Sequence, residues 1–342
     1  MKELRIGFIG SGWINEIHAA SLLKQPGVTL AAIYNHNLSR ATAFNQKILG
    51  GAAVCFDDHR KMIQTQKLDA IYVAIPPGAH GGEVEFAAEH GIHLMLEKPI
   101  ALSMERAESI ADVVKKAGVV CEIGHHMRHS EPARKLKDLL TSGEAGRPLF
   151  LNARFWTNGL FPAWWRDPNL GGGQLVEQAI HMYDLARYYL GEPDVISAFA
   201  DNLNHRQIPD YKVDDVSASV IRFKNGSIAS ITASNCSDPK TPGTTLTLQC
   251  QNVIAEFSAP DKATFAYTDG RVADQLWKDG FEIRREDVKS ENSMYDDLAA
   301  DFLAGIREGK PTRSSIEDGV ESLRLVLAAS KSAQQNGAAQ KM

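Results

Sequence analysis

The chain has no long hydrophobic run and no strongly basic stretch, and each absence excludes a class of protein. Its 37 basic and 42 acidic residues, among 342, give a net charge of −5. Without a basic surface, neither nucleic acid nor an anionic membrane is expected as a partner. No apolar run approaches the roughly 18 residues of a membrane-spanning helix. A glycine turn interrupts the N-terminal apolar stretch too early for a secretory signal, so we expect a cytoplasmic protein.

Cysteine is scarce and is not arranged for metal or disulfide chemistry. The four cysteines, Cys55, Cys121, Cys236 and Cys250, form no Cys-x-x-Cys pair. Their wide separation favours neither a disulfide framework nor a zinc site, so we interpret them as reduced packing residues and expect no metal.

The order of the apolar runs predicts an α/β protein with two domains. From Leu4 to about Gly124, short β-branched runs alternate with helical stretches, which is typical of a doubly wound parallel Rossmann sheet covered on both faces. After about Arg147, strand-like runs follow one another with few helices between them. We therefore predict a nucleotide-binding domain over 1–124 and an α+β domain with a large, mostly antiparallel sheet over 125–342. The first domain's runs are LRIGFIG, TLAAIYN, AAVC, DAIYVAI, HLMLEK and VVCEIG.

The second domain is expected to bind substrate and to associate with other copies of the chain. Amphipathic helices are predicted over 173–190, 294–307 and 316–333. The C-terminal helices among them either stay with this domain or pack back toward the first domain. Asn225-Gly226 and Asp269-Gly270 indicate tight turns. Helices on one face of a sheet leave the other face to be covered, so we expect a homodimer or homotetramer through this sheet.

A glycine turn near the N-terminus indicates a nucleotide site. Gly10, Ser11 and Gly12 follow a predicted strand and open a predicted helix, where backbone N–H groups and the helix dipole can receive a pyrophosphate. The third glycine of the usual Gly-x-Gly-x-x-Gly pattern is replaced by Asn15, so the helix must pack against the strand in another way.

The end of the second predicted strand leaves the choice between NAD and NADP open. Asn35 stands where an NAD-preferring site usually has an acidic residue. It can hydrogen-bond a ribose but does not repel a 2′-phosphate, and His36 or Arg40 is close enough in sequence to attract one. Each of these two side chains, taken singly, is equally well interpreted as a solvated surface group.

Two short segments carry candidate catalytic groups. Glu97 and Lys98 precede Pro99 at the end of an apolar strand, so they are expected to be extended and to point to opposite faces. The carboxyl ends of strands in an open α/β sheet line the ligand crevice, which places Lys98 to donate to a substrate oxygen. A surface lysine beside a turn is the plainer interpretation of this tripeptide alone.

The second segment is the predicted helix after Gly173. Glu177, His181 and Asp184 are spaced i, i+4 and i+7, which puts them on one face of an α-helix. An imidazole titrates near neutrality, so His181 could take a proton from a hydroxyl while a carboxylate orients it. Asp184 and Arg187 could instead form a plain ion pair.

Together these pieces resemble the Gfo/Idh/MocA family of nicotinamide-dependent oxidoreductases, over nearly the whole chain. The resemblance implies that Lys98, Glu177 and His181 form the catalytic group and that NAD or NADP is the cofactor. Glu177 stands where aspartate is commoner. The motifs are GFIGSGWI, VAIPPGAH, HGIHLMLEKP, GHHMR and GGGQLVEQAIHMYD. The cofactor site expected from them comprises Gly10, Gly12, Trp13, Ile14, Asn35, His36, Arg40, Pro76, His80, Glu97 and Lys98.

The reaction that the resemblance implies is hydride transfer between the nicotinamide and a carbinol carbon of a sugar, polyol or cyclitol. His181 would be the general base, Lys98 would polarise the oxygen, and Glu177 would orient His181 or bind a neighbouring hydroxyl. Trp164, Trp165 and Arg166 are expected to approach the substrate, because tryptophan faces suit sugar C–H surfaces. Such an aromatic cluster is as often domain packing or a subunit contact.

Three other functions stay open from the sequence. Some relatives retain NAD and hydrolyse glycosides through transient oxidation, and others sense nucleotide and sugar without turnover, although the presence of Lys98 and His181 argues against the latter. A metal-dependent isomerase built on His125, His126, Glu177 and His181 has no recognised ligand spacing. The Gly124–Arg128 segment is otherwise expected to join the domains.

Overall fold

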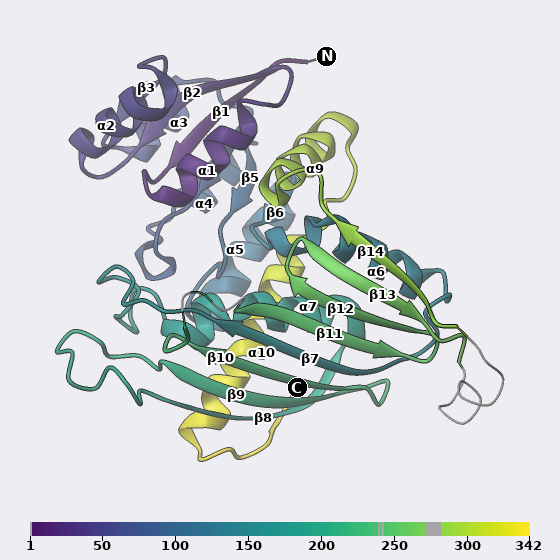
Figure 1. Cartoon of the computed structure of the whole chain (residues 1–342). Helices are drawn as coiled ribbons and strands as arrows, with labels where there is room; N and C mark the ends of the chain where they lie inside the picture. Colours follow the sequence, from purple (N-terminus) through teal and green to yellow (C-terminus); the bar gives the residue numbers. More distant parts are fainter. Residues whose placement is uncertain (1, 239, 241–242, 271–281) are drawn as a thin grey trace. The chain divides into compact units, whose positions relative to one another are not determined.

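The computed structural model describes residues 2–238, 240, 243–270 and 282–342 (Figure 1). The chain forms two compact units, one comprising Met1–His126 and Asn292–Glu321 and the other Met127–Glu291 and Ser322–Met342. The segment 292–321 therefore belongs to the first unit, although it follows the second unit's sheet in the sequence. Among the helices of the described residues, none combines the length and the apolar character that crossing a bilayer requires.

The first unit is a doubly wound parallel sheet, as the apolar runs predict. Its six strands have the order β3-β2-β1-β4-β5-β6, so the strand order reverses between β1 and β4. The strands are β1 (Leu4–Ile9), β2 (Val28–Tyr34), β3 (Val54–Phe56), β4 (Ala70–Val73), β5 (His93–Leu96) and β6 (Cys121–Ile123). The helices are α1 (Trp13–Leu22), α2 (Leu38–Leu49), α3 (His59–Thr65), η1 (Pro77–Ala79), α4 (Glu83–Glu89), α5 (Met104–Ala117) and α9 (Met294–Glu308).

Helix α9 completes the core of this unit, although it comes late in the sequence. Leu298 and Phe302 of α9 are fully buried in one cluster with Leu4 and Ile6 of β1 and Leu22 of α1. Burial of such side chains contributes about 1.5–3 kcal/mol each. The first unit therefore draws part of its hydrophobic core from beyond residue 291.

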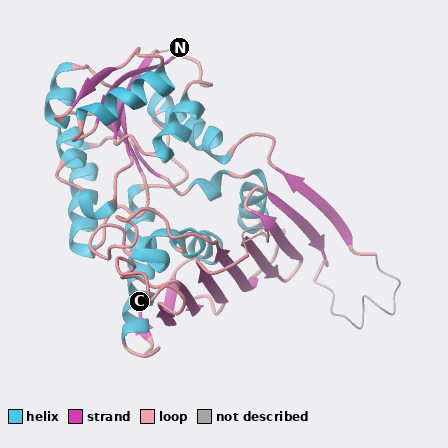
Figure 2. Cartoon of the chain, turned by 60° about the vertical axis from the view of Figure 1, so that its left-hand side comes forward, coloured by secondary structure: helices cyan, strands magenta, loops and turns pink. Residues whose placement is uncertain are grey.

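The second unit is a nine-stranded, mostly antiparallel sheet in the order β14-β13-β12-β11-β7-β10-β9-β8-β15, with β7 and β10 parallel. Figure 2 shows its strands side by side. Helix α7 packs against β7 and β10. The strands are β7 (Pro148–Trp156), β8 (Pro193–Asp201), β9 (Val216–Phe223), β10 (Ile228–Ser234), β11 (Thr244–Cys250), β12 (Val253–Ala259), β13 (Lys262–Tyr267), β14 (Arg284–Lys289) and β15 (Gln340–Lys341). The helices are η2 (His126–His129), α6 (Glu131–Thr141), η3 (Gln174–Gln178), α7 (Ile180–Leu190) and α10 (Ile316–Gln334), which passes from the first unit into the second.

Turn chemistry and strand alternation agree with the sequence in most of this sheet. Asn225-Gly226 joins β9 to β10, and Gly226 has a positive φ of 88°. Asp269 and Gly270 also have positive φ, but the residues that follow, 271–281, lie outside the described residues. Strand β14 was not predicted, because its sequence RREDVK has no apolar alternation. It lies at the edge of the sheet, where charged strands are usual.

The predicted single helix over 173–190 is wrong in its first part. Residues Gln174–Gln178 form a π-helical turn, in which Ala179 N–H bonds to the Gln174 carbonyl, and the α-helix begins only at Ile180. A π turn has more residues per turn than an α-helix, so the i, i+4, i+7 argument does not carry through it. Such turns recur at functional sites.

Candidate functional site

The glycine turn of the first unit is built to receive a phosphate. Gly10 has φ +97°, and a Cβ there would lie 2.3 Å from the carbonyl oxygen of Ala74, so only glycine fits. Helix α1 begins directly after Gly12, and no side chain caps it. The first N–H groups of a helix lack carbonyl partners in a preceding turn, and this makes the start of a helix a site for an anionic ligand. The turn therefore fits a dinucleotide pyrophosphate.

Asn15 explains how the turn forms without its usual third glycine. The side chain is fully buried, and its Nδ2 donates to the carbonyl oxygens of Gly10, at 2.8 Å, and Ile9, at 3.2 Å. The amide thus ties α1 to the end of β1 by hydrogen bonds, where a third glycine would permit close packing instead.

Asn35 ties the end of β2 to the same turn. Its Nδ2 donates to Ser11 Oγ at 2.8 Å, and its Oδ1 accepts from Asn37 N–H at 2.9 Å. His36 and Arg40, the other side chains considered for a 2′-phosphate, are both exposed. The sequence did not indicate that Asn35 would bind the glycine turn.

The other expected cofactor residues follow β4 and β5. Since β1, β4 and β5 are neighbouring parallel strands, the segments after them share one edge of the sheet. Pro76 and His80 follow β4 and Lys98 follows β5. His80 Nδ1 bonds to Glu83, which is buried on α4. Burial alone would raise the pKa of Glu83, but the bond to His80 and the nearby backbone N–H groups lower it.

Glu97 is turned inward and held by several groups of the first unit. His18 Nε2 on α1 lies 2.8 Å from Glu97 Oε1, and Lys98 N–H donates to Oε2 at 3.2 Å. A Cβ at Gly124 would lie 2.7 Å from Oε1, so glycine makes room for the carboxylate. Burial would raise the pKa of Glu97, but the hydrogen bond and charge of His18, with a contribution from Lys98, hold it below its usual value. Glu97 therefore anchors the segment that carries Lys98.

His126 belongs to the same cluster. Its ring stacks on Tyr295 of α9, with centroids 4.5 Å apart and planes at 20°. Burial lowers its pKa to about 4, and the charge of Lys98 adds to this effect against the opposing charge of Glu97. His126 is therefore neutral at neutral pH. The sequence singled out the Gly124–Arg128 segment as a connection between domains and gave no sign of this cluster or of His18.

In the second unit, Glu177 lies in the π turn and His181 at the start of α7. Trp165 Nε1 donates to Glu177 Oε2 at 2.8 Å. His181 is buried, and its ring lies parallel to that of Phe155 on β7, with centroids 6.1 Å apart. The sequence pattern identified both residues as candidates but did not indicate that Trp165 would donate to Glu177.

Asp184 pairs with Arg128, a partner that its i+3 spacing to Arg187 did not suggest. Its two carboxylate oxygens accept from Nε and Nη2 of Arg128, both at 2.7 Å, and Ser322 Oγ donates to Oδ1 at 2.8 Å. Both charged side chains are 2% exposed. Arg187 Nη2 lies 3.5 Å from Glu192 Oε1. The pair fixes α7 one turn beyond His181.

Trp165, the central residue of the segment 164–166 that was expected to contact the substrate, is buried in the protein. Trp165 is 2% exposed and lies in a cluster with Tyr211 and Val213, so its ring faces are covered and do not present a surface to a sugar, contrary to expectation. Trp164 is partly buried beside this cluster. Arg166 Nη1 bonds to Asp210 at 2.9 Å.

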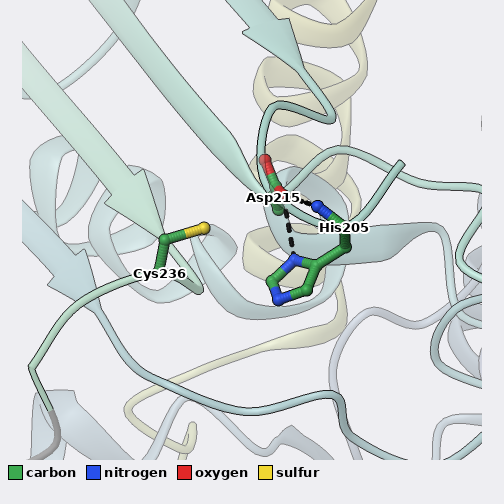
Figure 3. Close-up of side chains that lie close together, drawn as sticks. All are labelled: His205, Asp215 and Cys236. Atoms are coloured by element: carbon green, nitrogen blue, oxygen red, sulfur yellow. Dashed lines mark hydrogen bonds and ion pairs between the residues drawn. The ribbon is translucent and has the colours of Figure 1, made fainter. Parts of the chain in front are cut away.

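A group of metal-ligand types also lies in the second unit. His205, Asp215 and Cys236 have ligand atoms within 4.8 Å of one another (Figure 3). However, Asp215 already accepts N–H bonds from Leu203, Asn204 and His205 and a further bond from His205 Nδ1. Burial and the charge of Asp215 raise the pKa of Cys236, which favours the thiol. Asp215 therefore holds the loop before β9 together through its hydrogen bonds to residues 203–205.

The fold and the glycine turn define a dinucleotide-binding protein, and sequence comparison identifies its family as one of oxidoreductases. Residues 4–125 match the oxidoreductase family with an NAD-binding Rossmann fold, and residues 133–254 match the GFO/IDH/MocA C-terminal domain. The chain belongs to the Gfo/Idh/MocA family, as its motifs suggested.

Relatives and solved structures agree with this assignment. D-glucoside 3-dehydrogenase of Escherichia coli (strain K12) is 30% identical over 243 residues, which is 66% of this chain and 69% of that protein. The scyllo-inositol 2-dehydrogenase (NAD(+)) of Bacillus subtilis (strain 168) is 29% identical over 238 residues, covering 69% and 68%. Levoglucosan dehydrogenase, solved with NADH and levoglucosan, shares the fold, with a TM-score of 0.89, 22% identity and 99% of both chains covered.

Proposed function

We propose that this protein is a dehydrogenase that moves a hydride between the nicotinamide of NAD or NADP and a carbinol carbon of a sugar, polyol or cyclitol. The observation that carries the proposal is the shared edge of β1, β4 and β5, where the glycine turn follows β1 and Lys98 follows β5, with β4 between them. In open α/β sheets, ligands bind at this edge, where the strand order reverses. The names of the inositol and glucoside dehydrogenases among the relatives support the substrate class.

The roles of the chain's own residues follow from their chemistry. The cofactor, when bound, supplies the hydride acceptor. Lys98 donates a hydrogen bond to the substrate oxygen, and Glu97 holds the lysine's backbone. His181 takes the hydroxyl proton, and Glu177 orients His181 or binds a neighbouring hydroxyl. The residues that bind the pyrophosphate are the backbone of Gly10–Gly12 and the start of α1, including Trp13 and Ile14.

The test is the absorbance of reduced nicotinamide when the purified protein meets NAD or NADP with a panel of inositols, glucosides, anhydro sugars and sugar acids. We expect reduction with one group of these substrates. No reduction with either cofactor, together with NAD released on denaturation, would favour a hydrolase that retains its cofactor and would overturn the proposal.

Cofactor preference gives a prediction at Asn35. Asn35→Asp is expected to raise the ratio of kcat/KM with NAD to that with NADP by about tenfold, because a carboxylate repels the 2′-phosphate. Asp can still accept from Asn37 N–H, so the turn is kept. Asn35→Leu removes the hydrogen bonds to Ser11 and Asn37 without adding charge, and should not raise the ratio. An equal ratio in wild type and Asn35→Asp would mean that residue 35 does not face the ribose.

We also propose a homodimer or homotetramer formed through the open face of the second unit's sheet. Phe199 on β8 is 63% exposed and Val220 on β9 is 55% exposed, on the face opposite the buried Ala198 and Ile221. Light scattering should show an oligomer for the wild type and a smaller species for Val220→Glu.

We also propose a cytoplasmic location, because the free cysteines suit a reducing compartment.

A further inference from the structure

The indole of Trp165 is held rigidly between three other side chains. Its ring lies 4.9 Å from that of Phe161, centroid to centroid, and 6.2 Å from Tyr211 in an edge-on arrangement, and it packs with Val213. The side chain is almost fully buried. A tryptophan packed on its faces has only its ring N–H left for a polar contact.

That N–H is directed at the acid of the π turn. Trp165 Nε1 donates to Glu177 Oε2 at 2.8 Å, and indole nitrogen can only donate. Hydrogen bonds to a charged acceptor are stronger than those between neutral groups. Because the indole is fixed, the bond fixes the direction of the carboxylate as well.

The loop before β9 holds both partners of this bond. Asp215 accepts four hydrogen bonds from Leu203, Asn204 and His205, and Figure 3 shows those from His205. The His205 ring stacks on Tyr211 with centroids 4.6 Å apart. Tyr211 in turn contacts Trp165. Asp215 therefore fixes His205, and the His205 ring packs on Tyr211, which packs on the indole of Trp165.

The same loop also fixes the backbone of the π turn. Leu175 N–H donates to Asp214 Oδ2 at 3.0 Å, two residues before Glu177. Asp214 is the neighbour of Val213, which packs on Trp165. Donor and acceptor of the Trp165–Glu177 bond are thus both anchored on residues 211–215.

We propose that Trp165 is a positioning residue, which aims the Glu177 carboxylate for the reaction without touching the substrate. The inference rests on the proposed function.

The test is Trp165→Phe, which keeps an aromatic ring and removes the N–H. We expect kcat to fall by about 10- to 100-fold, the range for loss of a hydrogen bond to a charged group, with KM for the cofactor unchanged. In a Glu177→Gln background, which itself impairs turnover, the same substitution should have much less additional effect. A purely structural role would lower kcat and raise the KM for the cofactor, and would lower kcat equally in both backgrounds.

The matched control is Trp156→Phe. Trp156 Nε1 donates to Thr232 Oγ1 at 3.1 Å in the same unit, but this bond involves no acid. We expect the control to leave kcat within about twofold. If Trp165→Phe behaves like Trp156→Phe in an active wild-type background, the inference is wrong while the proposed function stands.

A second measurement does not depend on turnover. The indole N–H resonance of Trp165, assigned by its loss in Trp165→Phe, should shift in Glu177→Gln and hardly move in Asp210→Asn, which changes an acid bound to Arg166 instead. An indole signal that does not respond to Glu177→Gln would overturn the inference, even if no substrate were found.

Discussion

Lys98→Met lowers turnover by about two to four orders of magnitude and leaves cofactor binding almost unchanged. Methionine keeps most of the side chain's length but has no donor, so the oxygen that gains charge in the transition state loses its stabilising partner. Glu97, His18 and Gly124 hold the backbone at this point and are not altered. The measurements are kcat/KM on the identified substrate and cofactor affinity by calorimetry.

The control for this result is Lys116→Met, an exposed lysine on α5 of the same unit, which should keep wild-type turnover. Equal turnover in Lys98→Met and the wild type would remove Lys98 from the mechanism. Loss of cofactor affinity with unchanged kcat would mean that the lysine binds the nucleotide and does not act on the substrate.

Asp184→Ala is expected to lower the free energy of unfolding by about 3–5 kcal/mol. The substitution leaves the Arg128 guanidinium buried without its carboxylate, and breaking a buried ion pair from one side has this cost. Total stabilities are about 5–15 kcal/mol, so the loss should be evident in urea unfolding followed by circular dichroism.

Asp194→Ala provides the comparison. Asp194 makes a similar two-nitrogen contact with Arg222, but the arginine is 61% exposed, so its loss should cost less than about 1 kcal/mol. The double substitution Arg128→Met with Asp184→Leu should recover part of the stability, because neither charge is left buried alone. Equal urea midpoints for Asp184→Ala and Asp194→Ala would show that the buried pair does not stabilise the unit.

The fold was largely predictable because its signals are local. Six apolar runs in the first half correspond to β1–β6, and alternation in the second half locates β7–β13. The edge strand β14 was missed, since charged side chains along an edge hide the period of two. The π turn was missed because hydrophobic spacing does not distinguish it from α-helix over five residues.

The site was predictable only in its individual residues. Glycine turns and Lys98 stand out because they follow strands, and His181 because of its family motif. Their partners could not be found: His18 is 79 positions from Glu97, and Arg128 is 56 from Asp184. Such pairs depend on how distant segments meet in the fold. The spacing of residues along a single sequence indicates local structure and does not show which distant residues come into contact. The catalytic roles of Lys98, Glu177 and His181 stay predictions.

The chain passes between its two units three times, after residues 126, 291 and 321. A gene fragment cut at the end of the family match, residue 125, would therefore encode a nucleotide-binding sheet without α9. Such a fragment would expose the surface of β1 and α1 that Leu298 and Phe302 cover in the whole protein. Exchange of the nucleotide-binding part between relatives by simple recombination is accordingly constrained, because a functional transplant must carry two separate stretches of the gene.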